Sequence, residues 1–159
     1  MRSKLFVPGS RPELFAKALA SEADALSFDL EDSVAPARKA EARTALRDFF
    51  CSGALTGCGK TIIVRINASD TPFFAADIQA MAQTGVHMLN LPKPRDANDV
   101  RDTSKAIGKA QIDNKVSGSI GLLLNIETPN ALRTAHELAL ADPRVVGLQL
   151  GLGDWFEPL

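Results

Sequence analysis

Short apolar segments alternate with longer amphipathic segments along the whole chain. The apolar segments are closed by glycine, proline or acidic residues, which is typical of buried strands. The segments between them repeat apolar residues at helical spacing. We predict strands near residues 4–7, 24–30, 61–66, 87–91, 119–126 and 146–150. We predict helices over residues 11–20, 36–50, 72–83, 97–111 and 131–141, with Ser10 as the N-cap of the first.

Strict alternation of strand and helix is compatible with a doubly wound sheet or with a (β/α)8 barrel. The parity of side chains along the second predicted strand favours the barrel. Leu26, Phe28 and Leu30 share one face, while Ser27, Asp29 and Glu31 share the other. A face that becomes polar near the carboxyl end of a strand is typical of an active-site mouth. Residues 7–12 contain one glycine, so the glycine-rich turn of a dinucleotide-binding sheet is missing.

We therefore predict an α/β fold of the (β/α)8 TIM-barrel type in which residues 1–159 form a single domain. A complete barrel needs about 250 residues. The predicted barrel is thus truncated after the sixth strand, with six β and five α elements. Its first and sixth strands would leave backbone groups unpaired and the apolar interior exposed. We expect such a chain to self-associate as a homo-oligomer, or else to be the ordered remnant of a longer polypeptide.

The charge balance excludes some classes of partner. Lys and Arg number 18 and Asp and Glu number 19, which gives no electrostatic reason to expect nucleic acid or an anionic membrane. No apolar run approaches the roughly 20 residues that span a bilayer. Cys51 and Cys58 have no histidine nearby, so we expect free thiols rather than zinc, with a local disulfide left open. We predict a soluble, cytoplasmic protein.

Two carboxylates mark the strongest candidate site. Glu127 and Asp154 each follow an apolar strand, and the predicted helix lies between them. A strand–helix–strand unit is parallel, so both residues should lie at the same edge of the sheet. Neighbouring carboxylates repel unless a proton or a cation lies between them. Oxygen ligands with few protein partners suit Mg²⁺, which we predict here.

Arg65 is the second candidate, because a buried arginine needs acidic or oxyanionic partners. Its planar fork would fit a substrate carboxylate, or a structural ion pair with Asp29 or Glu31. Both interpretations stay open. Asp29, Glu31 and Asp32 could supply oxygens to metal-bound water. Alternatively, Asp32 or Ser33 caps the next helix.

Several lysines and arginines have a functional and a structural interpretation. Lys93, between two prolines, could meet a substrate anion or be a solvated loop charge. Four cations on or beside helices could attract a phosphorylated cofactor, although such residues mostly form solvated faces. These four are Arg11, Lys17, Lys39 and Arg43.

Seven motifs carry a resemblance to a known family. They are Arg2–Pro12, Asp29–Pro36, Lys39–Arg43, Val64–Asn67, Leu91–Lys93, Ile126–Pro129 and Gly151–Asp154. In order and spacing they resemble the citrate lyase beta subunit family, the CitE-like acyl-CoA lyases that include malyl-CoA and citramalyl-CoA lyases. The resemblance implies a TIM barrel of the phosphoenolpyruvate/pyruvate type. It also implies cleavage of a 3-hydroxyacyl-CoA into an acyl-CoA and a 2-oxo acid.

The resemblance implies a role for each candidate. Glu127 and Asp154 would bind Mg²⁺, and Arg65 would contact the oxo acid. Glu31 and Asp32 would be catalytic acids lining the site, and Lys93 and Gly153 would lie beside the substrate. Members of the family continue through two further strands to a carboxyl-terminal lid. The alternative is therefore a catalytically silent relic that binds Mg²⁺ and a small oxo acid, or that serves as an assembly partner.

Overall fold

The structure is a computed structural model that describes residues 1–152. Two of the predicted site residues, the metal ligand Asp154 and the substrate contact Gly153, lie outside the described residues.

Six parallel strands form one sheet in the order in which they occur along the chain. They are β1 (Lys4–Pro8), β2 (Ala25–Asp29), β3 (Thr61–Arg65), β4 (Met88–Leu91), β5 (Gly121–Ile126) and β6 (Val145–Leu150). All six lie within two residues of the predicted bounds. Sequential order distinguishes this sheet from a doubly wound one, in which the strand order reverses. The predicted α/β fold of TIM-barrel type is confirmed.

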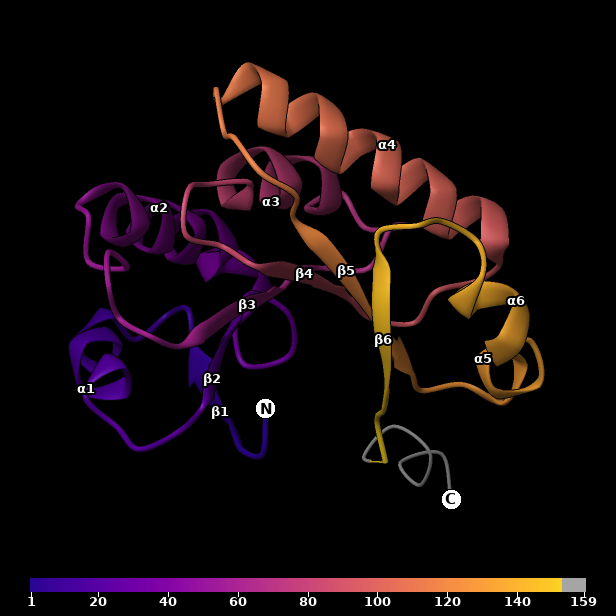
Figure 1. Cartoon of the computed structure of the whole chain (residues 1–159), viewed down its shortest axis with the longest axis horizontal. Coiled ribbons are helices and arrows are strands. Elements are labelled where there is room, and N and C mark those ends of the chain that lie inside the picture. Colours follow the sequence, from indigo (N-terminus) through magenta and orange to yellow (C-terminus); the bar gives the residue numbers. More distant parts are fainter. Residues whose placement is uncertain (153–159) are drawn as a thin grey trace.

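The helices lie around the outside of the curved sheet (Figure 1). The first two begin with a 3-10 turn, since proline stands in their first turn. The helical segments are η1 (Pro12–Leu14), α1 (Phe15–Leu19), η2 (Pro36–Arg38), α2 (Lys39–Cys51), α3 (Phe74–Met81), α4 (Ala97–Asp113), α5 (Pro129–Arg133) and α6 (Ala135–Ala139). None of those described is long and apolar enough to cross a membrane.

Two details of the predicted helices are wrong. Ser10 is not an N-cap: Arg11 holds that position before η1, and it makes no side-chain cap hydrogen bond. The helix expected over residues 131–141 is divided into α5 and α6 at Thr134. The hydroxyl of Thr134 donates to the carbonyl of Asn130 at 3.0 Å, a bond to the preceding turn that often bends helices.

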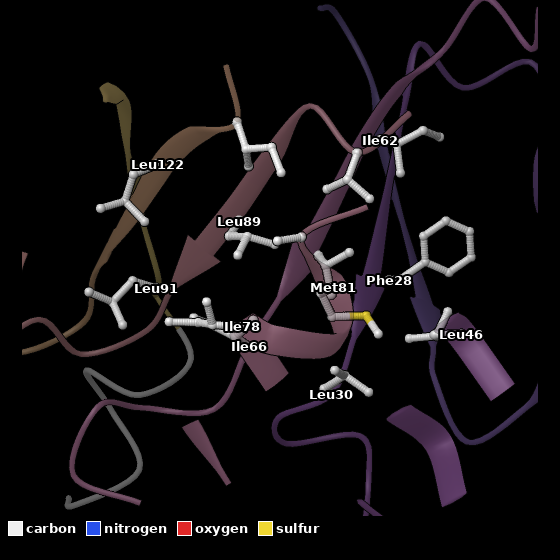
Figure 2. Packing of buried hydrophobic residues seen from close by; sticks show 14 of the residues in the cluster. Phe28, Leu30, Leu46, Ile62, Ile66, Ile78, Met81, Leu89, Leu91 and Leu122 are labelled. Carbon is white, nitrogen blue, oxygen red and sulfur yellow. The ribbon is translucent and has the colours of Figure 1, made fainter. Parts of the chain in front are cut away.

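The main core lies between the sheet and the helices, as the side-chain parity predicted. Phe28 of β2 and Leu30, which directly follows that strand, lie near Leu46 of α2, and Met81 of α3 lies near them (Figure 2). All four are completely buried. Burying one such side chain stabilises a fold by roughly 1.5–3 kcal/mol. This core fixes the outer face of the sheet and leaves the inner face for polar groups.

The inner face of the sheet has a small apolar cluster of Ala25, Ile63 and Leu123. The ammonium of Lys4 on β1 donates to the side-chain carbonyl of Gln149 on β6. These strands lie at opposite ends of the sheet order, so their side chains meet across the concave interior. The sheet is therefore curled as part of a barrel, and its strand ends form one mouth.

Candidate functional site

Polar side chains occupy the carboxyl ends of neighbouring strands. Asp29 of β2, Arg65 of β3 and Asn90 of β4 are successive partners in the strand register. Glu31 follows β2 and Glu127 follows β5. Parallel α/β folds build their sites at this edge. The register alone thus brings these residues to one place.

Arg65 and Asp29 form a bidentate ion pair. The Nε–Oδ1 and Nη2–Oδ2 distances are 2.7 and 2.8 Å. The Asp29 carboxylate also accepts hydrogen bonds from the backbone N–H groups of Glu31 and Ser33, at 2.9 and 3.0 Å. Burial would raise the pKa of Asp29, but the hydrogen bonds and charge of Arg65 hold it below its ordinary value. The predicted ion pair with Asp29 is confirmed, and it fixes the orientation of the guanidinium.

The remaining terminal nitrogen of Arg65 faces two further carboxylates. Its Nη1 lies 2.8 Å from Glu31 Oε2 and 3.1 Å from Asp32 Oδ2. The structure therefore brings Arg65, Glu31 and Asp32 together, as the sequence predicted. The helix-capping alternative for Asp32 or Ser33 is wrong. Ala35 holds the N-cap position of η2 without a side-chain cap, since the turn before it is organised by Asp29.

Glu31 is a carboxyl that changes protonation near neutral pH. Burial raises its pKa to about 7, against the charges of Arg65 and Lys93. The ammonium of Lys93 lies 3.6 Å from Glu31 Oε1. Lys93 itself is in the left-handed region, with φ of 48°, which costs a non-glycine residue of order 1–3 kcal/mol. Lys93 thus contacts the site and is only partly exposed to solvent.

Glu127 is buried at the end of β5, with 6% of its surface exposed. Its Oε1 accepts a hydrogen bond of 2.6 Å from Asn125 Nδ2. The chain after β6 passes very close, because a Cβ placed on Gly151 would lie 2.3 Å from Glu127 Cγ. Gly151 stands three residues before Asp154 in the sequence, although Asp154 itself is not described.

The carboxylate oxygens of Glu127 are ligands that suit a hard cation. Mg²⁺ commonly takes one or two protein carboxylates and completes its shell with waters and substrate oxygens. Residues 1–152 contain no cluster of three or more His, Cys, Asp or Glu side chains that could hold a metal. A site of the Mg²⁺ kind does not require such a cluster.

Two hollows adjoin these side chains on either side of Asp32. One of about 400 Å³ is lined by Phe6, Asp29, Asp32 and Arg65. The other, of about 450 Å³, is lined in part by Asp32, Lys39, Phe73 and Lys93. A larger hollow of about 500 Å³ lies beside Leu55 and Gly85, and its lining includes none of these carboxylates.

Three further side chains support the site. Asn67 follows the end of β3 at Arg65, and its amide donates to Asp77 of α3 at 2.6 Å. Arg43 was expected on a solvated face, but it pairs with Asp77 at 2.8 Å. Lys39 is buried and donates to the backbone carbonyls at Leu30 and Glu31.

Arg11 and Lys17 are exposed, as expected of solvated helix faces. Cys51 and Cys58 are free thiols, also as expected. Asn90 and Asn125 were not predicted from the sequence as site residues. Their polar side chains on the inner face of apolar strands were the available signal.

Comparison with known proteins identifies relatives that share both sequence and fold. Over 163 residues the chain is 37% identical to the citrate lyase subunit beta of Escherichia coli strain K12, covering 99% of this chain and 52% of the relative. It is 34% identical over 157 residues to the L-malyl-CoA/beta-methylmalyl-CoA lyase of Rhodobacter capsulatus, covering 97% of this chain and 49% of that enzyme.

Solved structures also include proteins that are similar to this chain in sequence and in fold. The citrate lyase beta subunit of Mycobacterium tuberculosis, complexed with oxaloacetate and magnesium, is 36% identical with a TM-score of 0.70. That match covers 95% of this chain and 58% of the other. CitE of the same organism, in complex with magnesium, acetoacetate and coenzyme A, is 35% identical with a TM-score of 0.68. It covers 95% of this chain and 48% of that one.

The chain spans about half the length of the curated relatives it matches. The family model of the HpcH/HpaI aldolase/citrate lyase group matches residues 2–159. With this match and relatives above 30% identity over nearly all of its length, the chain belongs to the HpcH/HpaI aldolase/citrate lyase family.

Proposed function

We propose that this chain forms the site of a Mg²⁺-dependent carbon–carbon lyase. Its substrate would be a 3-hydroxyacyl-CoA of the citryl-CoA, malyl-CoA or citramalyl-CoA type, and its products an acyl-CoA and a 2-oxo acid. The observation that carries the proposal is the fixed guanidinium of Arg65. It borders a hollow at the barrel mouth and is held there by both oxygens of Asp29.

Arg65 would bind the oxo-acid end of the substrate. Cleavage removes the proton of the 3-hydroxyl group, breaks the adjacent carbon–carbon bond and leaves its electron pair on the thioester enolate. A new carbonyl group forms on the 2-oxo acid. The positive fork of Arg65 would stabilise oxygen charge during this change, and its orientation is set before substrate binds. Glu31, with a pKa of about 7, would hold or release a proton at its carboxyl oxygen.

Glu127 and Asp154 would hold the metal. When bound, Mg²⁺ would supply Lewis-acid stabilisation of negative charge on substrate oxygens. Asp32 would orient bound water from the rim of the site, since its side chain is largely exposed and contacts Arg65 at 3.1 Å. Lys93, beside Glu31, and Gly153 would contact the substrate. The family relationship and the acidic setting of the site support these assignments.

A second candidate is a catalytically silent protein that binds Mg²⁺ and a small oxo acid, or that serves as an assembly partner. The observation that favours it is the length of the relatives, about half of which has no counterpart in this chain. Catalytic groups contributed by that part would be needed for turnover.

A turnover assay separates the two candidates. The chain is mixed with Mg²⁺ and each of citryl-CoA, malyl-CoA and citramalyl-CoA, and release of the 2-oxo acid is followed. Lyase activity should fall about 10²–10³-fold in Arg65→Lys, which keeps the charge but loses the fork. Arg47→Lys, on an exposed arginine of α2, is the matched control and should keep full activity. Binding of Mg²⁺ and oxo acid without turnover supports the silent binding protein. Absence of both binding and turnover contradicts the lyase and the binding protein, and leaves the assembly partner.

A further inference from the structure

Two buried asparagines connect neighbouring strands to Glu127. Asn90 lies on β4 and Asn125 on β5, and their exposed fractions are 0% and 1%. Asn90 Nδ2 donates to Asn125 Oδ1 at 2.8 Å, and Asn125 Nδ2 donates to Glu127 Oε1 at 2.6 Å. Asn90 Nδ2 also donates to the backbone carbonyl of Leu123 at 3.0 Å. The three side chains form one hydrogen-bonded chain that ends on the carboxylate.

The orientation of both amides is fixed by neighbouring groups that can only accept a hydrogen bond. A backbone carbonyl only accepts, so the carbonyl of Leu123 requires the nitrogen end of Asn90 to face it. The second hydrogen of that nitrogen then requires the oxygen end of Asn125 to face Asn90. The nitrogen end of Asn125 is therefore directed at Glu127, where it can only donate. Each amide orients the next, and no other arrangement satisfies the same contacts.

An amide donor held in one orientation restricts the orientation of the carboxylate that accepts its hydrogen bond. Metal-ligating carboxylates are themselves hydrogen-bonded in most sites, and loss of such a partner typically costs about 10–100-fold in metal affinity. Gly151 also confines Glu127, because even a Cβ there would overlap the glutamate side chain. Glu127 is thus restricted by an amide donor and by a close backbone segment.

We propose that Asn90 and Asn125 are positioning residues that orient Glu127 for a divalent cation, Asn125 directly and Asn90 through Asn125. This proposal rests on the proposed metal role of Glu127. We call this arrangement a relay, since Asn90 orients Asn125 and Asn125 orients Glu127. A relay makes metal affinity depend on both residues in series, whereas two asparagines that merely fill the inner core would affect only stability.

Metal affinity is the readout, measured by electron paramagnetic resonance with Mn²⁺ and by competition with Mg²⁺. Asn125→Leu should weaken Mn²⁺ binding about 10–100-fold. Asn90→Leu keeps the direct donor but removes what orients it, so its loss should be smaller. The double variant should bind no more weakly than Asn125→Leu alone, because residues in series are not additive.

The matched control is Asn114→Leu. Asn114 also donates its amide to two backbone carbonyls, at Gln79 and Ala82, but it lies at the end of α4. This change should lower stability and leave Mn²⁺ affinity as in the wild type. Circular dichroism checks that Asn125→Leu is folded. If it is not, the Mn²⁺ affinity of Asn90→Leu alone tests the relay, and an affinity equal to that of the wild type overturns it.

Glu127→Gln separates failure of the relay from failure of the proposed function. If Glu127→Gln loses Mn²⁺ binding while both asparagine variants bind as the wild type does, the relay is wrong and the metal role stands. If Glu127→Gln binds as the wild type does, the metal role of Glu127 is wrong and the relay falls with it. Losses in Glu127→Gln and in both asparagine variants support the proposal.

Discussion

Arg65 shows how a buried charge can be held ready at a site. Its side chain is 14% exposed, and that of Asp29 is 3% exposed. Burial alone would lower the pKa of Arg65, but the contacts with Asp29 raise it above its ordinary value. An ion pair this far from water is stable only with good geometry and further hydrogen bonds. Asp29 meets both conditions and leaves the Nη1 side of Arg65 facing the mouth.

Asp29→Asn should lower the free energy of unfolding at pH 7 by about 3–5 kcal/mol, because the buried guanidinium loses the carboxylate that holds it through two hydrogen bonds. The pKa of Asp29 is lowered in the fold, so its contribution is complete above the unfolded value of about 3.9. That contribution is lost as pH falls through the folded pKa. Urea unfolding should therefore show a difference at pH 7 that shrinks below about pH 4.

Asp48→Asn is the control for this comparison, since Asp48 is exposed and pairs with Arg47 on the surface. Its unfolding free energy should change by at most about 0.5 kcal/mol. An Asp29→Asn protein as stable as the wild type at pH 7 would show that the pair does not support the site.

Lys93→Met should raise the pKa of Glu31 further, because the ammonium 3.6 Å away favours the ionised carboxylate. Titration of the glutamate side-chain carbons by ¹³C NMR measures this change. Lys109→Met is the control, as Lys109 pairs with Asp113 on the exposed face of α4. A Glu31 titration unaffected by Lys93→Met would mean that this contact does not persist in solution.

At the scale of elements, the period of the side chains predicted most of the fold. A strand bounded by proline or acidic residues can be placed from sequence because its two faces alternate strictly. The end of a strand is less predictable: the third strand was expected to reach residue 66, but β3 ends at Arg65. Thr134, which divides the last helix, acts through a hydroxyl bond that apolar spacing does not reveal.

The candidate site was predictable in part for the same reason. Parity and parallel topology brought Arg65, Glu31 and Asp32 to one edge. The link from Asn90 to Asn125 was not predictable, because it depends on register: Asn90 pairs with Leu123, so Asn125 lies diagonally from it. Lys39 was misplaced because its ammonium binds backbone carbonyls, and these leave no mark in the sequence.

The segment after β6 has a specific role in confining Glu127. Gly151→Ala would place a methyl group 2.3 Å from Glu127 Cγ, so the glutamate or the backbone must move. We expect Mn²⁺ affinity to fall, as measured by electron paramagnetic resonance. In Gly147→Ala, on β6 itself, the added methyl group meets its nearest atom, Leu123 Cδ1, at 3.4 Å, and this variant should bind as the wild type does. Equal affinity in both variants would argue against confinement.

At the scale of the whole molecule, the outer side of β6 carries exposed apolar side chains. Leu148 and Leu150 are 41% and 54% exposed, whereas Leu122 and Leu124 on the neighbouring strand are fully buried. Contiguous apolar surface of this kind favours association. The contact between Lys4 and Gln149 bridges the interior but does not cover this outer side.

The 159-residue chain should therefore self-associate, and light scattering should give a mass above that of the monomer. Replacing Leu148 and Leu150 together by lysine should shift the material toward monomer. Ile112→Lys is the control, because Ile112 is an aliphatic residue of the same size that is 79% exposed on α4. It should leave association unchanged. A monodisperse wild-type monomer that unfolds cooperatively would contradict this expectation.

The proposed function requires Arg65 and a Mg²⁺ site to act together on a 2-oxo acid. Calorimetric titration with pyruvate and with oxaloacetate, each with and without Mg²⁺, measures this coupling. We predict that Mg²⁺ tightens binding of the oxo acid to the wild type. We also predict that Arg65→Met loses most of that binding while its far-UV circular dichroism is unchanged. Equal affinity with and without Mg²⁺, and equal affinity in wild type and Arg65→Met, would contradict the proposed function.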